Sequence, residues 1–239
     1  MTYEILKKMQ AANRNAADRL QYGHTQNPLN ENADMTNTLH SAVFAAAMHI
    51  AGKKDVRHYL NGLLIEPGRD GAVCVATDGR RLLVIRTNVP WSLGSVIVPR
   101  AACEHIAKIK GPVQFEGEGE RFAAVSGSAK YGFTPIDGRF PEWRAVFPHD
   151  RNEVQATGLN PFLLEGVMKS AKLLIGEFGN LRGRNRSALA IKLHGESSSL
   201  MTVTELREDS PVTHAAFVVM PMRDSAPDSA FNTQAFTAP

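Results

Sequence analysis

One order of elements, a helix followed by about three strands, is predicted three times along this chain and limits the fold more than any other feature. Apolar residues recur at the spacing of one helix face at about 37–51, 100–110 and 161–175. Thr36 or Asn37 can cap the first helix, and Asn160 the third. Strands at 95–99 and 153–158 lead into the second and third helices. Each copy therefore has the order β-α-β-β-β, with the first strand of the first copy missing or degenerate.

Alternating and apolar runs between the helices predict the other strands. They are expected at 58–67, 71–78, 80–87, 113–119, 121–127, 129–136, 188–195, 200–206 and 214–222. Repetition of one supersecondary unit indicates that the units pair to bury their apolar faces. The expected fold class is α+β, with helices packed on antiparallel sheets.

Composition excludes several classes of protein. The chain is 43% hydrophobic and 21% charged, which is typical of a globular protein. It has no apolar run of the roughly 18 residues that a membrane span needs. Cys74 and Cys103 are too few for a disulfide framework or a zinc site, and both lie in apolar stretches. We expect reduced core cysteines, a cytosolic setting and no cofactor.

Basic side chains gather on the polar sides of the expected helices and in the loop "NLRGRNRS" (180–187), although the net charge is only +3. Two interpretations are open: a solvated helix face, or a surface that contacts phosphates without reading base sequence. No stacking platform or recognition helix indicates base readout.

Motifs for catalysis are missing from the sequence. It has no phosphate-binding GxxxxGK[ST] loop, no HExxH and no GxSxG. Asp78 and Asp137 each begin an Asp-Gly-Arg triplet, which is typical of turns, although paired acids could also hold a metal. An enzyme is disfavoured, and a nuclease that uses these two aspartates is kept as a third hypothesis.

Five stretches closely resemble the bacterial DNA polymerase III β subunit, the sliding clamp, and occur in the order of that family. They are "DVRHYLNGLLIE" (55–66), "VATDGRRLLVI" (75–85), "SVIVPR" (95–100), "IDGRFPEWRAVFP" (136–148) and "AAFVVMPMR" (215–223). The resemblance implies the fold of DNA clamps (processivity factors), in which repeated β-α-β-β-β units place helices around a central hole. It also implies duplex DNA, polymerases and a clamp loader as partners, and no active site.

The resemblance further implies one apolar pocket that binds short peptides containing Gln, Leu and Phe. Carried over by position, that pocket would use Leu60, Thr77, Gly79, Arg81, Leu82, Pro141, Val146, Val218, Val219, Met220, Pro221 and Met222. The chain departs from the family at Arg80, Trp143 and Ala145. It also continues past the family's usual end with a tail that contains Phe231 and Phe236, and we expect this tail to compete with partner peptides.

Basic residues give the expected DNA-binding set. They are Arg80, Arg100, Lys108, Lys110, Lys169, Lys172, Arg182, Arg184 and Arg186. A sequence-independent phosphate surface is the role expected for them.

Four segments are expected along the chain, and the family's first domain is absent from it. They are a helical and linker segment at 1–35, a domain at 36–150 like the family's second, half of a third domain at 151–223, and a disordered tail at 224–239. A half-domain leaves a sheet edge uncovered, so we expect self-association through 151–223. The leading hypothesis is a clamp-like processivity factor in the bacterial cytosol or nucleoid. The alternative is a clamp-derived regulator that binds clamp partners without encircling DNA.

Overall fold

A computed structural model describes residues 36–147, 158–182, 186–193 and 199–221. The expectations for 1–35 and for the tail at 224–239 lie outside these residues, as does nearly all of the strand expected at 153–158. Among the described helices, none has both the length and the hydropathy to cross a bilayer.

The elements follow the predicted order. They are β1 Thr38–His40, α2 Ser41–Ala47, η2 His58–Leu60, β2 Gly62–Pro67, β3 Ala72–Thr77, β4 Arg81–Thr87, β5 Val96–Pro99, α3 Arg100–Ile106, β6 Pro112–Glu118, β7 Arg121–Ser126, β8 Ala129–Phe133, η3 Trp143–Val146, α4 Pro161–Phe178, β9 Leu189–Leu193, β10 Ser199–Val203 and β11 Val212–Val219. The expected α+β class with repeated β-α-β-β-β units is thus observed.

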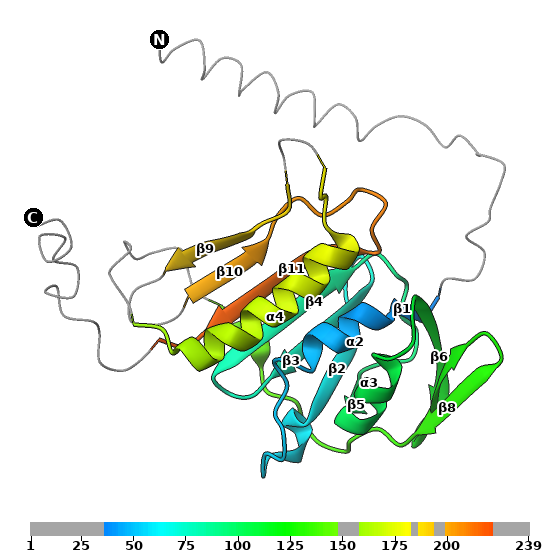
Figure 1. Ribbon diagram of the computed structural model, residues 1–239. Coiled ribbons are helices and arrows are strands. Elements are labelled where there is room, and N and C mark those ends of the chain that lie inside the picture. The colour runs from blue at the N-terminus through cyan, green and yellow to red at the C-terminus, as the bar shows by residue number, and fades with distance from the viewer. Residues whose placement is uncertain (1–35, 148–157, 183–185, 194–198, 222–239) are drawn as a thin grey trace, which may run out of the picture. The chain divides into compact units, whose positions relative to one another are not determined.

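Two antiparallel sheets divide the strands (Figure 1). The larger has the order β5-β2-β3-β4-β11-β10-β9 and the smaller β1-β6-β7-β8. In the larger sheet β11 pairs with β4 from Val212 opposite Thr87 to Val219 opposite Arg81, with an irregularity between Val212 and His214. One edge of the third unit is therefore covered by the first unit of the same chain. The self-association expected from an open edge must use another side of that unit.

The first helix is shorter than predicted. Residues 38–40 are extended and pair with Pro112–Gln114, so the helix begins at Ser41. The cap is His40, whose Nδ1 accepts from the Ala42 N–H at 3.3 Å, and not the predicted Thr36 or Asn37. The first copy thus has its leading strand, reduced to three residues.

The third helix agrees closely with its prediction. The Asn160 side chain accepts from the Phe162 N–H at 2.9 Å, and Pro161 occupies the first turn, where its missing N–H costs nothing. Val167, Ala171 and Leu174 are buried against the sheet.

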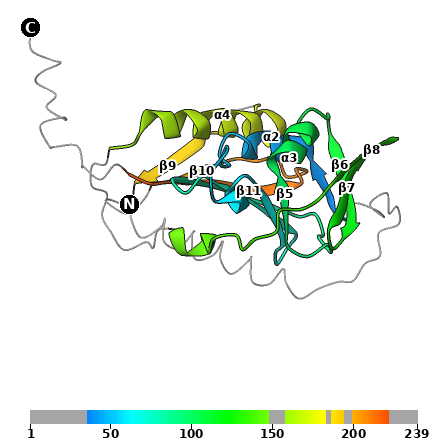
Figure 2. The ribbon, with the colours of Figure 1, turned by 90° about the horizontal axis from the view of Figure 1, so that it is seen from below.

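Helices α2, α3 and α4 all cover one face of the larger sheet, and the short η3 crosses the other face (Figure 2). Beneath the helices lies the main apolar core, which includes Phe44, Phe115 and Phe217. A second, smaller cluster on the opposite face joins Trp143 to side chains of β2, β3, β4, β5 and β11. Cys74 and Cys103 are both free and buried, and burial raises the pKa of the Cys74 thiol to about 12.

Close packing joins α2 to α4. The Arg81 guanidinium donates to the Leu163 carbonyl at 3.0 Å, and His40 forms an ion pair with Glu177 at 3.3 Å when it is protonated. A Cβ atom on Gly166 would lie 1.8 Å from Arg81 Nη1 and 2.8 Å from the His49 carbonyl oxygen. Gly166 therefore lets the helix approach its neighbour.

Alanine at Gly166 tests this packing. Glycine to alanine within a helix normally stabilises by roughly 1 kcal/mol, but Gly166→Ala is expected to destabilise by about 1–3 kcal/mol through overpacking. Gly176→Ala is the matched control, because a Cβ there meets nothing within 4 Å, and it should stabilise. Urea unfolding measures both, and equal stabilisation by the two variants would contradict the packing.

Candidate functional site

A cavity of about 230 Å³ opens where β11 ends beside the turn between β3 and β4. We call it the strand-end pocket. Its lining is Arg57, Tyr59, Leu60, Thr77, Gly79, Arg80, Arg81, Leu82, Pro141, Glu142, Trp143, Val146, Val218 and Met220. These residues come from η2, the β3–β4 turn, the η3 segment and the end of β11, which are far apart in the sequence.

Hydrogen bonds fix the β3–β4 turn that forms one wall. Asp78 Oδ1 accepts from the backbone N–H groups of Arg80 and Arg81 at 2.9 and 3.0 Å, and Asp78 Oδ2 pairs with the Arg81 guanidinium at 2.9 Å. Thr77 Oγ1 donates to the Arg81 carbonyl and accepts from the Gly79 N–H. Gly79 has φ +86°, which favours glycine. The Asp78 carboxylate thus serves as a turn-forming group.

The floor of the pocket is apolar and the rim is accessible. Leu60, Leu82 and Val218 are buried, whereas Val146 is 42% and Met220 50% exposed. The Met220 N–H donates to the Arg80 carbonyl at 2.9 Å, which ties the end of β11 to the turn. An apolar cavity with a flexible methionine at its mouth can accept apolar side chains of a ligand.

A polar edge lies beside the apolar floor. The Arg57 guanidinium donates to Asp55 at 2.9 Å and to the Asp78 carbonyl at 3.3 Å. The hydrogen bonds from Arg57 to Asp55 lower the pKa of this half-buried carboxyl to about 2, so it is charged at neutral pH. The edge can therefore offer the Arg57 guanidinium to polar groups of a ligand.

Nine of the twelve residues expected in the pocket line this cavity. The exceptions are Val219, which is buried in the core beneath the helices, Pro221, which is half-buried outside the lining, and Met222, which lies outside the described residues. Val219 faces away because neighbouring residues of a strand point to opposite faces. Arg57, Tyr59, Glu142 and Trp143 also line the cavity and were not among the twelve residues expected there. The three-residue spacing of Trp143 and Val146, one turn of a short helix, could have indicated Trp143.

Trp143 also lines two larger cavities along the same face of the sheet, of about 510 and 680 Å³. Its ring is buried and lies 4.1 Å from the Arg144 guanidinium, which pairs with Glu66 at 2.7 Å. Trp143 Nε1 has no hydrogen-bond partner within the part of the chain that the structure describes. The ring acts as an apolar plug between the three cavities.

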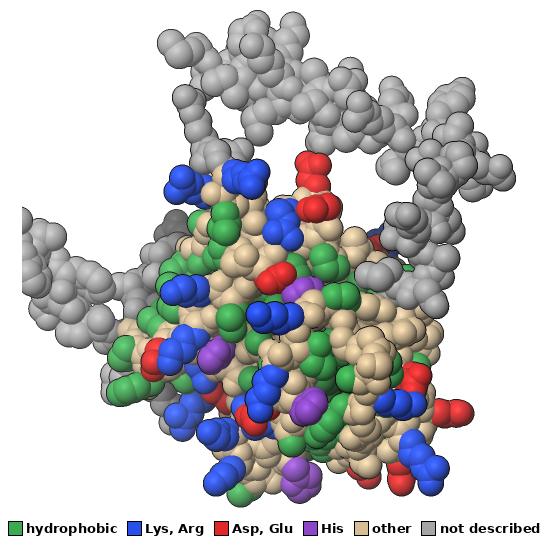
Figure 3. Space-filling model, turned by 45° about the vertical axis from the view of Figure 1, so that its right-hand side comes forward, with side chains coloured by type: hydrophobic (Ala, Val, Ile, Leu, Met, Phe, Trp, Pro, Cys, Tyr) green, Lys and Arg blue, Asp and Glu red, His purple; other side chains and the backbone are tan. Residues whose placement is uncertain are grey.

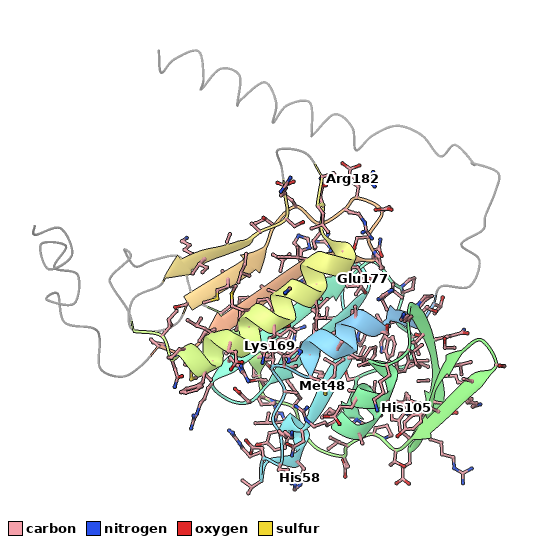
Figure 4. All side chains as sticks on the ribbon, in the orientation of Figure 1. Met48, His58, His105, Lys169, Glu177 and Arg182 are labelled. Atoms are coloured by element: carbon pink, nitrogen blue, oxygen red, sulfur yellow. The ribbon has the colours of Figure 1, made fainter. Side chains whose placement is uncertain are left out.

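Basic side chains occupy the helix-covered face (Figure 3). Lys108, Lys110, Lys169, Lys172, Arg182 and Arg186 are all exposed on or just after α3 and α4, and Arg184 lies outside the described residues. In Figure 4 Lys169 projects from α4, and Arg182 lies beyond its C-terminal end.

A cavity of about 300 Å³ between α2 and α4 is lined by four cations, Lys53, Arg81, Arg100 and Lys169, and by Glu165, which pairs with Lys169. Burial lowers the pKa of His49 there, and Lys169, Arg81 and Arg100 lower it further. The histidine is therefore neutral at pH 7.

Two of the residues expected to bind DNA, Arg80 and Arg100, do not lie on the exposed helix surface. Arg80 lines the strand-end pocket. The Arg100 guanidinium is largely buried and donates to the carbonyls of Met48, Ala51 and Gly52 at 3.3, 2.7 and 2.9 Å, so it secures the end of α2. Its donors are mostly occupied within the protein.

Residues 33–142 match the family model described as the central domain of the DNA polymerase III beta subunit. The beta sliding clamp of Escherichia coli K12 is 32% identical over 130 residues, which are 52% of this chain and 35% of that protein. The chain thus matches about a third of the length of this relative.

Solved structures agree on the fold. The DNA polymerase III subunit beta of Pseudomonas aeruginosa aligns with a TM-score of 0.52 and 20% identity, over 86% of this chain and 70% of that one. The sliding clamp of Bartonella birtlesii, solved bound to griselimycin, aligns with a TM-score of 0.53 and 15% identity, over 86% of this chain and 69% of that one.

Two substitutions test the plug formed by Trp143. Trp143→Ala should destabilise the protein by about 3–5 kcal/mol, the usual cost of emptying an aromatic site. Trp143→Phe should cost less than half as much, because the indole N–H gives up no protein hydrogen bond. Urea unfolding followed by circular dichroism measures both. A phenylalanine variant as unstable as the alanine variant would show that the plug model is wrong.

Proposed function

We propose that the chain is a relative of the DNA polymerase III β subunit and acts as a clamp-like replication factor without catalytic activity. It docks a partner peptide in the strand-end pocket and contacts duplex DNA, without sequence preference, through the basic helix face. The observation that carries the proposal is the assembly of one apolar pocket from four distant segments, with most of the residues that the resemblance implied.

The pocket suits a short linear peptide with large apolar side chains. Leu60, Leu82 and Val218 supply a preformed floor, so little entropy is lost in the protein on binding. Polymerases and other replication proteins of the cytosol are the proposed sources of such peptides, and a loader is a further proposed partner.

Charge substitution at the rim tests the pocket without disturbing the core. Val146→Glu and Met220→Glu should each weaken binding of a fluorescent peptide containing Gln, Leu and Phe by at least about tenfold, roughly 1.4 kcal/mol. The reason is that each places an unpaired charge beside an apolar ligand. Val56→Glu is the control, since Val56 is 90% exposed and lies outside the pocket. Equal peptide affinities for all three variants, measured by fluorescence anisotropy, would contradict the proposed site.

Salt dependence tests the DNA contact. Each phosphate contact adds about 0.9 to the magnitude of the slope of log K against log salt concentration. Lys169→Gln with Lys172→Gln should therefore reduce that magnitude by up to about two on a duplex of any sequence. Lys130→Gln is the control, because Lys130 is also an exposed, ion-paired lysine but lies on β8 of the smaller sheet and not on α4. An unchanged slope in the double variant would remove α4 from the proposed DNA surface.

A second candidate function is a regulator that holds clamp partners and does not encircle DNA. The observation in its favour is that one further unit, α4 with β9, β10 and β11, follows the first two within the described residues, where a whole domain of the resemblance would have two. Retention on circular but not on linear DNA would support the encircling clamp. Peptide binding without such retention would support the regulator.

A further inference from the structure

Exposed apolar side chains lie at the rim of the strand-end pocket. Val146 of η3 is 42% exposed, and Met220, which directly follows β11, is 50% exposed. Pro141, a third residue of the lining, is exposed as well. Leu82 and Val218 form the buried apolar floor beneath them. An open apolar surface gathered around a cavity is typical of a docking site.

The rim also has a cation without a partner. The guanidinium groups of Arg57 and Arg81 each pair with an aspartate. The exposed Arg80 guanidinium makes no ion pair or hydrogen bond with any residue that the structure describes. Glu142, the one carboxylate in the lining, lies beside η3 and not in the β3–β4 turn that carries Arg80. The turn side of the pocket can therefore bind a carboxylate of an occupant.

The stretch of chain that follows β11 has the matching groups. Residues 224–239, "DSAPDSAFNTQAFTAP", include two aspartates and no lysine or arginine. Their only large apolar side chains are Phe231 and Phe236. Asp224 comes four residues after Met220, whose N–H donates to the Arg80 carbonyl at 2.9 Å. The acidic part of the segment is therefore close in sequence to the residue that contacts Arg80, and the phenylalanines follow.

Chain length allows this segment to reach the pocket. The described residues end at Pro221, and Phe231 and Phe236 lie ten and fifteen positions beyond it. A flexible chain spans about 5–6 Å times the square root of its residue number, which is roughly 16–19 Å for ten residues and 19–23 Å for fifteen. The cavity measures only about 230 Å³, and Met220 is itself part of its lining. Either phenylalanine can therefore turn back into the pocket without stretching the chain.

We propose that residues 224–239 occupy the strand-end pocket of their own chain, with a phenylalanine on the apolar floor and an aspartate at Arg80. The inference rests on the proposed function, because the same pocket takes the partner peptide, and it adds an occupant that regulates access. A short tether gives the segment an effective concentration in the millimolar range. Even weak docking therefore fills a large share of the pockets, and a partner peptide binds only if it displaces the segment.

Peptide affinity of the full chain tests the competition. Phe231→Ser with Phe236→Ser should strengthen binding of the fluorescent peptide containing Gln, Leu and Phe at least about threefold, because the tethered competitor is lost. Thr233→Ser with Thr237→Ser is the matched control, since it changes the same segment and keeps both phenylalanines. Asp224→Asn with Asp228→Asn should give a smaller gain that disappears as the salt concentration rises. Anisotropy titrations in which the phenylalanine variant and the wild-type chain bind equally well would overturn the proposal.

Methyl NMR spectra recorded without any added peptide detect the docked segment directly. The signals of Val146, Val218 and Met220 should differ between the wild-type chain and the phenylalanine variant, whereas that of Met201 in the core should not.

The two measurements together separate this proposal from the proposed function. Pocket signals that differ, in chains that bind no added peptide, would support the docked segment and contradict the peptide function. Identical pocket signals with equal peptide binding would contradict the docked segment and leave the peptide function standing. Signal differences that vanish on dilution would assign the segment to the pocket of a neighbouring copy and overturn the proposal.

Discussion

Pairing of β11 with β4 is the constraint on which the rest of this structure depends. It joins two segments about 130 residues apart in one antiparallel ladder, from Val212 opposite Thr87 to Val219 opposite Arg81. The same pairing brings α4 beside α2 over the main core, and it carries Met220 to the turn at Arg80. Without it the strand-end pocket would lose a wall and the third unit would lose its support.

Local patterns in the sequence predicted most elements but not how they join. The limits of α4 follow from Asn160, Pro161 and a regular apolar stripe, all of which act within a few turns. The start of α2 was missed because residues 38–40 adopt an extended conformation only through pairing with β6, a contact that local propensity cannot reveal. The β4–β11 join is likewise a long-range contact.

In the candidate site, too, local features could be predicted from the sequence and long-range contacts could not. Nine residues that the resemblance implied do line the pocket. Several of them belong to the stretch from Thr77 to Leu82, which forms a turn through its own local hydrogen bonds. Neighbouring strand residues point to opposite faces of the sheet, so Val218 lines the pocket and Val219 lies in the core beneath the helices. The register of β11 against β4 determines which of the two valines lies on which face. Arg100 appeared in the sequence as a surface cation, whereas the folded chain uses it to hold three carbonyl groups at the end of α2.

The central claim is that the strand-end pocket holds a peptide, and methyl NMR spectroscopy tests it most directly. On titration with a peptide containing Gln, Leu and Phe, the methyl signals of Leu82, Val146, Val218 and Met220 should shift together with one dissociation constant. Those of Val56, outside the pocket, and Met201, in the core beneath the helices, should stay in place. Shifts that spare the four pocket residues, or no shifts at all, would contradict the account.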